Sequence, residues 1–127
     1  MNTTHRSIRN SPAAPGIARR YVGESLAGAP PEVVDSAELM VSELATNCVR
    51  YVETDFTVTV ERTPQQVRVD VADSGRGAVE MQDPTPADAS GRGLRIVDEL
   101  ADAWGVDVAA GDRDGKSVWF TLALHDA

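Results

Sequence analysis

The sequence predicts an α+β fold, a two-layer sandwich with helices packed on one face of a mixed, mostly antiparallel sheet. Three observations carry this prediction. Two segments with helical spacing come first, a hairpin with period-two alternation follows, and a third helical segment precedes a second hairpin. The order is therefore ααββαββ. A chain of 127 residues is long enough for one such domain with a single core.

The N-terminal part of the chain is predicted to hold an arm and two helices. Residues 1–14 are polar and lack apolar periodicity, so we expect a flexible arm there and a single domain over 15–127. Apolar residues at helical spacing predict a helix over 15–26 and, after a break at two prolines, a longer helix over 31–50. Pro31 and the glutamate after it suit the first turn of the longer helix.

The middle of the chain is predicted to hold a hairpin and a long loop. Residues 56–61 and 67–72 each alternate apolar with mostly polar side chains, and a Thr-Pro-Gln-Gln segment between them can turn the chain. This pattern indicates antiparallel strands with one buried face. Residues 73–92 hold Gly, Pro, Asp and Ser without periodicity. A loop of this length in a compact domain is usually functional or mobile.

The C-terminal part is predicted to form a helix and a closing hairpin. Apolar side chains from Leu94 to Trp104 lie at helical spacing, and Gly105 is expected to end the helix. Strands are expected near 106–109 and 116–124, joined by a turn rich in glycine and aspartate.

Charge and composition exclude several classes of function. The chain has 12 basic and 20 acidic residues, a net charge of −8, so no direct nucleic-acid partner and no anionic membrane partner are expected. The single cysteine, Cys48, excludes an internal disulfide and a cysteine zinc cluster. No apolar run approaches the length of a membrane span or a signal peptide. We therefore expect a cytoplasmic protein.

Two glycine patterns resemble phosphate-binding motifs but fail on spacing. Gly75 and Gly77 follow a strand, yet the third glycine of a dinucleotide fingerprint would fall on Glu80. Lys116 and Ser117 follow a glycine as in a P-loop, but the first glycine of that motif is missing and a strand pattern follows where a helix is needed. Neither a Rossmann site nor a Walker-type site is predicted.

Three other features remain as candidates for a nucleotide site. Glu43 and Asn47 are one helical turn apart, where a carboxylate and an amide oxygen can act as base and metal ligand. Asp73 ends a predicted strand before a glycine-rich turn and can accept a hydrogen bond from an exocyclic amine. Ser90 and Arg92 lie in a glycine-containing segment at a predicted helix start, which suits phosphate. Each feature taken alone also fits a structural role, as a solvated helix face, a turn or an N-cap.

The order and spacing of these features carry a family resemblance. The segments Glu43 to Asn47, Asp73 to Gly77 and Gly91 to Leu94 resemble the N box and the two glycine boxes of the ATP-binding domain shared by histidine kinases, gyrase-type ATPases and Hsp90-type chaperones, the GHKL or Bergerat-fold superfamily. Residues 38–50 and 90–98 are similar to small actinobacterial anti-sigma-factor serine/threonine kinases. The resemblance runs from about residue 15 to residue 124.

The resemblance implies ATP and Mg2+ as ligands and assigns roles to individual residues. It implies Glu43 as the general base, Asn47 as the Mg2+ ligand and Asp73 as the acceptor for the adenine amino group. Gly75 and Gly77 are then expected to line the base pocket.

The second glycine box is implied to bind the phosphates. Gly91, Arg92, Gly93 and Leu94 are expected to meet them where the third helix starts. Ser117 is implied to lie near the adenine, at the position where the family usually has threonine.

Two departures from the family pattern bear on the site. Tyr51 stands where these domains commonly have histidine, so contacts near the end of the N box are expected to differ. The loop over 78–89 is short and lacks an obvious anchoring lysine, which resembles the abbreviated lid of the anti-sigma kinases. Weak retention of the nucleotide is expected from this loop.

The resemblance also implies partners and leaves alternatives open. It implies a sigma factor and a STAS-type anti-sigma-factor antagonist that carries the target serine or threonine, with phosphorylation switching between them and so regulating transcription. Formation of a homodimer is left open, since Arg19 and Arg20 lie on the first predicted helix, which in this family can contribute to a dimer or partner surface. One alternative is an ATP-binding module that sequesters its partner without phosphotransfer. Another is the ATPase part of a split histidine kinase, although His5 and His125 lie on no helical pattern.

Overall fold

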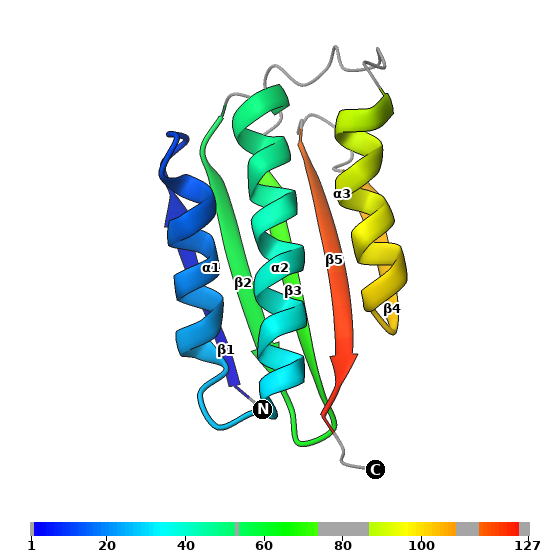
Figure 1. The fold of residues 1–127 in the computed structure, drawn as a ribbon. Helices are drawn as coiled ribbons and strands as arrows, with labels where there is room; N and C mark the ends of the chain where they lie inside the picture. Colours follow the sequence, from blue (N-terminus) through cyan, green and yellow to red (C-terminus); the bar gives the residue numbers. More distant parts are fainter. Residues whose placement is uncertain (1, 53, 74–86, 109–114, 125–127) are drawn as a thin grey trace.

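The computed structural model describes residues 2–52, 54–73, 87–108 and 115–124, and it describes the backbone alone at 51–52, 87–93 and 108. Within these residues, helices cover one face of a five-stranded sheet, and the other face is open (Figure 1). The predicted α+β class is confirmed. In chain order the elements are β1 (Asn2–Ile8), α1 (Ala14–Ser25), α2 (Pro31–Asn47), a π-helical turn (Cys48–Val52), β2 (Phe56–Arg62), β3 (Gln66–Asp73), α3 (Ala87–Leu100), β4 (Ala103–Val108) and β5 (Lys116–Ala123).

The sheet has the strand order β1-β2-β3-β5-β4, and all four pairings are antiparallel. The prediction of a mixed sheet is therefore wrong for the described strands. Helix α3 returns the chain along the sheet, so β4 runs in the same direction as β3. Strand β5 lies between β3 and β4, however, and no parallel pair forms.

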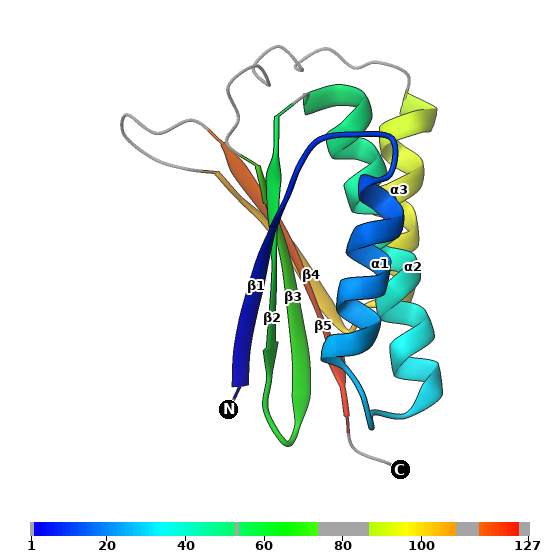
Figure 2. The same ribbon diagram turned by 90° about the vertical axis from the view of Figure 1, so that its left-hand side faces the viewer.

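The N-terminal segment is a strand and not the predicted flexible arm. Strand β1 pairs with β2 over its full length, from Asn2 opposite Arg62 to Ile8 opposite Phe56. Figure 2 shows it at one edge of the sheet. Residues 2–7 are exposed, and only Ile8 is buried. Hydrophobic alternation reports burial of one face, and this exposed edge strand buries almost nothing, so its sequence carried no strand pattern.

The core lies between the helices and the inner face of the sheet. The alternating positions of β2 and β3 point inward, where Phe56, Val58 and Val60 face Val67, Val69 and Val71, all at most 3% exposed. The helices contribute small and medium side chains to the same cluster: Ala14, Ala18, Val22, Ala37, Met40, Val41, Leu44, Ala45 and Val97. No helix in the described ranges is both long enough and apolar enough to cross a membrane.

Helix α3 ends earlier than predicted, and Trp104 belongs to a strand. The helix spans Ala87–Leu100, and Trp104 lies in β4 opposite Phe120. The backbone N–H of Asp102 donates to the carbonyl of Thr121, and its carboxylate accepts from the N–H of Ala123, so the chain is drawn to β5 directly after the helix. Helical spacing from Val97 to Trp104 was therefore misleading, because tertiary pairing ended the helix.

The open face of the sheet carries a stack of two side chains. The guanidinium carbon of Arg68 lies 4.5 Å from the ring centroid of Trp119, and Asp70 accepts hydrogen bonds from Arg68 at 3.0 and 3.2 Å. The hydrogen bonds and charge of Asp70 raise the pKa of Arg68 above its ordinary value. Trp119 lies half-buried on this outer face and not in the core between the sheet and the helices.

The indole of Trp119 lies against Gly105 of β4, its cross-strand neighbour. A Cβ atom at this position would lie 2.8 to 3.0 Å from three ring atoms of Trp119. Gly105→Ala is therefore expected to displace the indole and to lower the free energy of unfolding by about 1–3 kcal/mol. Urea unfolding followed by tryptophan fluorescence measures the loss. Gly16→Ala is the matched control, since a Cβ there meets one atom at 3.9 Å and is expected to be neutral or stabilising. Equal stability of the two variants would contradict the prediction.

Candidate functional site

Glu43 and Asn47 lie on one flank of α2, near its C-terminal end. The stripe of α2 that faces the sheet includes Met40, Leu44 and Ala45. Glu38 marks the flank toward α1, because its carboxylate lies against Gly23 of that helix. At 100° per residue, Glu43 and Asn47 lie about 140° and about 180° around the axis from Glu38. They therefore face the side of α3, which packs beside α2 (Figure 1). Both side chains are half-buried.

Asp73 lies at the same end of the fold, as the last residue of β3. Its position continues the inward alternation of Val69 and Val71, so it belongs to the face that the helices cover. The backbone N–H of Lys116, at the start of β5, donates to its carboxylate oxygen Oδ1 at 3.3 Å. The end of β3, the start of β5 and the end of α2 thus surround one region, as Figure 2 also shows.

Lys116 lies beside Asp73 in this region and was not predicted from the sequence as a candidate site residue. Its position continues the inward alternation of Val118 and Phe120, and its charge acts on Cys48 of the π-helical turn. The alternation along β5 was the signal that could have found it, since Lys116 and Ser117 must point to opposite faces.

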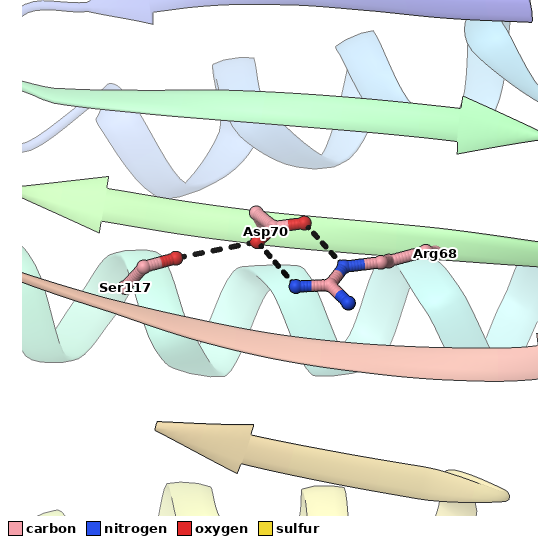
Figure 3. Close-up of polar contacts among 3 residues, drawn as sticks. All are labelled: Arg68, Asp70 and Ser117. Atoms are coloured by element: carbon pink, nitrogen blue, oxygen red, sulfur yellow. Dashed lines mark hydrogen bonds and ion pairs between the residues drawn. The ribbon is translucent and has the colours of Figure 1, made fainter. Parts of the chain in front are cut away.

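The structure does not bring Ser117 together with Asp73. The hydroxyl of Ser117 donates to Asp70 Oδ2 at 3.3 Å on the open face of the sheet (Figure 3). Asp73 belongs to the opposite face, which the helices cover, because side chains alternate between the two faces along a strand. The predicted position of Ser117 near the adenine stays a prediction, and it is not compatible with an adenine bound by Asp73 on the covered face.

The described part of α3 spans Ala87–Leu100, and Gly91, Arg92 and Gly93 lie within this helix. Their predicted contact with the phosphates stays a prediction. Leu94 is half-buried and packs against the core.

Other predicted site residues lie outside the described parts of the chain. Gly75 and Gly77 fall in the range 74–86, and most of the predicted long loop falls there too. The side chains of Arg92 and Tyr51 are also outside the description. Among the described residues, no group of three or more His, Cys, Asp and Glu side chains could hold a metal ion.

Cys48 is buried directly after Asn47, between the end of α2 and the sheet. The pKa of the Cys48 thiol is raised from 9.0 to about 12, mainly by burial and also by the charge of Asp73, while the charge of Lys116 opposes this shift. The residue is 6% exposed. The electrostatic coupling indicates that Asp73, Lys116 and Cys48 share one environment.

This pKa shift predicts a loss of stability in alkaline solution. Between pH 9.0 and about 12 the unfolded thiol gives up its proton while the folded thiol keeps it. The unfolded state then binds fewer protons, so the free energy of unfolding falls with rising pH, by about 1.4 kcal/mol per pH unit. Cys48→Ala is expected to remove this part of the slope. Urea unfolding of both proteins across the same pH range tests it, and equal slopes would contradict the assignment.

The fold and this arrangement of side chains define the class as a histidine kinase-like ATPase domain. The chain belongs to this family, since the family model matches residues 8–122. Among curated proteins, no sequence matches the chain. The superfamily predicted from the three motifs is confirmed.

A similar solved structure contains the RsbU and RsbW domains of Rv1364c from Mycobacterium tuberculosis. The match has a TM-score of 0.74 at 18% sequence identity, and it covers 100% of this chain and 34% of that chain. The likeness at this identity supports the fold. The chain spans about a third of the length of that protein.

Proposed function

We propose that this chain binds ATP and Mg2+ between α2 and α3 and acts as an anti-sigma factor with serine/threonine kinase activity toward an anti-sigma-factor antagonist. Membership in the histidine kinase-like ATPase family supports the nucleotide. The motifs over 38–50 and 90–98 support the narrower activity. The observation that carries the proposal is the position of Asp73 near the end of α2, where its charge acts on Cys48, the residue directly after Asn47.

The side chains present fit these ligands. Asn47 offers a half-buried carboxamide oxygen, and Mg2+ binds through few protein oxygens while it keeps waters and phosphate oxygens. Asp73 is held by the N–H of Lys116 and offers a carboxylate to the adenine amino group. Gly75 and Gly77 are proposed to line the base pocket. The N–H groups at the start of α3 suit the phosphates through the helix dipole.

The proposed chemistry uses Glu43 as the base. Bound Mg-ATP supplies the γ-phosphoryl group for transfer. Glu43 lies one helical turn before Asn47, about 6 Å along the axis, and accepts the proton of the attacking Ser or Thr hydroxyl. Positioning and charge stabilisation account for most of the rate in phosphoryl transfer, so the relative placement of these two side chains matters most.

The proposed partners are a sigma factor and a STAS-type antagonist in the cytoplasm. Phosphorylation of the antagonist would release it and return the domain to the sigma factor. A homodimer is compatible with this scheme. The net charge of −8 favours protein partners over nucleic acid or an anionic membrane.

One observation favours a second candidate, an ATP-binding module without phosphotransfer. The second glycine box lies within α3, where its N–H groups are engaged in the helix. If residues 91–93 stay helical with nucleotide bound, the backbone N–H groups of Gly91 and Gly93 are not available to the phosphates. Such a domain could hold ATP and sequester a sigma factor.

The test is phosphotransfer from γ-labelled ATP to purified antagonist proteins, with and without Mg2+. We expect Mg2+-dependent labelling of a Ser or Thr on an antagonist. Saturable ATP binding without labelling of any antagonist would support the binding module. No ATP binding at millimolar concentration would overturn both forms of the proposal.

A further inference from the structure

The C-terminal end of α2 lacks the usual devices that end a helix. Its capping residue, Cys48, keeps right-handed helical angles, and no basic side chain lies in the last turn. The chain instead continues into the π-helical turn Cys48–Val52. The last carbonyls of a helix have no partner within the helix and need other donors. Asn47 stands directly at this point.

Asn10, in the segment between β1 and α1, supplies such a donor from a distant part of the sequence. Its amide nitrogen Nδ2 donates to the carbonyl of Cys48 at 3.3 Å and to the carbonyl of Thr54 at 3.0 Å. Its backbone N–H donates to Asp55 Oδ1 at 2.9 Å. One residue therefore joins both ends of the turn that follows α2.

Asn10 follows a strand that is anchored to the sheet. Strand β1 ends two residues earlier at Ile8, which is 2% exposed and paired with Phe56. Tyr21 of α1 also ties to β1 by donating its hydroxyl hydrogen to Thr4 at 2.8 Å. Asn10 is thus fixed to the edge of the sheet, and its hydrogen bonds transmit that position to the end of α2.

We propose that Asn10 is a positioning residue for the magnesium ligand Asn47. This inference rests on the proposed function. By holding the carbonyl that follows Asn47, Asn10 sets the direction of the last turn of α2 and of the Asn47 carboxamide. Loss of a group that orients a metal ligand typically lowers metal affinity by about 10–100-fold. The loss is therefore expected in the Mg2+-dependent part of nucleotide affinity.

The test compares Asn10→Asp with a matched control, Thr63→Ala. Aspartate keeps the size of asparagine but cannot donate to the two carbonyls. The side-chain hydroxyl of Thr63 makes three local hydrogen bonds in the β2–β3 turn, at the opposite end of the sheet. Calorimetry with ADP is carried out with and without Mg2+, and amide hydrogen exchange is measured in the nucleotide-free proteins. Asn10→Ala repeats the loss without a negative charge if the aspartate variant does not fold.

We expect Asn10→Asp to weaken ADP binding about tenfold or more in Mg2+ and to leave binding without Mg2+ unchanged. Exchange is expected to rise over 44–52 in this variant and near residues 63–67 in the control. Equal Mg2+ dependence in wild type and variant, with unchanged exchange over 44–52, would overturn the inference. If wild type binds no nucleotide, the proposed function fails. Faster amide hydrogen exchange over 44–52 in Asn10→Asp would then still support the conclusion that Asn10 stabilises the end of α2. Unchanged exchange would refute that conclusion.

Discussion

Glu43→Gln is expected to lower the rate of phosphoryl transfer by about 10²–10⁴-fold, the usual contribution of a general base. Glutamine keeps the shape of the side chain but cannot take a proton from the attacking hydroxyl at neutral pH. The affinity for Mg-ATP is expected to change by less than about threefold, because Asn47 and Asp73 remain in place. For comparison, a tenfold change in affinity corresponds to about 1.4 kcal/mol of binding free energy. Single-turnover transfer to the antagonist measures the rate, and calorimetry measures the affinity.

The matched control for this variant is Glu38→Gln. Glu38 lies on the same helix, but its carboxylate packs against Gly23 of α1, on the opposite flank from Glu43. It should keep the wild-type rate. Transfer by Glu43→Gln at the wild-type rate would refute the role of Glu43 as the base. Loss of ATP binding in this variant would instead indicate that Glu43 maintains the nucleotide cage.

Asp73→Asn is expected to abolish detectable ATP binding or to weaken it by about 100-fold, since hydrogen bonds to charged groups contribute about 1.5–3 kcal/mol. The carboxylate has two acceptor oxygens, and one of them accepts from the N–H of Lys116. Asparagine has a single acceptor oxygen. The NH2 group of the asparagine must therefore face either the Lys116 N–H or the adenine amino group. Both of these are donors, so one of the two hydrogen bonds is lost. Calorimetry with ATP in Mg2+ measures the loss.

Two variants on the other face of the sheet serve as controls for Asp73→Asn. Asp70 is three residues earlier on β3, and Ser117 donates to it on the open face. Asp70→Asn and Ser117→Ala are expected to leave ATP affinity unchanged. Binding lost through Ser117→Ala would show that the adenine lies against the open face, contrary to the position derived for Asp73. Binding kept by Asp73→Asn would remove Asp73 from the site.

The sequence by itself determined the elements that bury an apolar face. Helix α2 and strands β2 and β3 follow their hydrophobic periods closely, because burial against a common core imposes those periods. The N-box spacing of Glu43 and Asn47 also follows from helical geometry alone, since two residues four apart share a face of any α-helix. The class of protein was predicted from the resemblance of three sequence motifs to a known family, and the family model confirms it.

Tertiary structure decided what local patterns do not encode. Strand β1 forms because the edge of β2 supplies backbone hydrogen bonds, although its own side chains stay exposed. Trp104 lies in a strand and not in the predicted helix, because the chain after Leu100 pairs with β5. The hydrogen bond from Asn10 to Cys48 joins residues 38 positions apart in sequence, and the hydrogen bond from Ser117 to Asp70 joins residues 47 positions apart. Hydrophobic periodicity indicates which side of a helix or strand is buried. Contacts between distant elements determine which elements are neighbours, where each element ends and which partners its polar side chains meet.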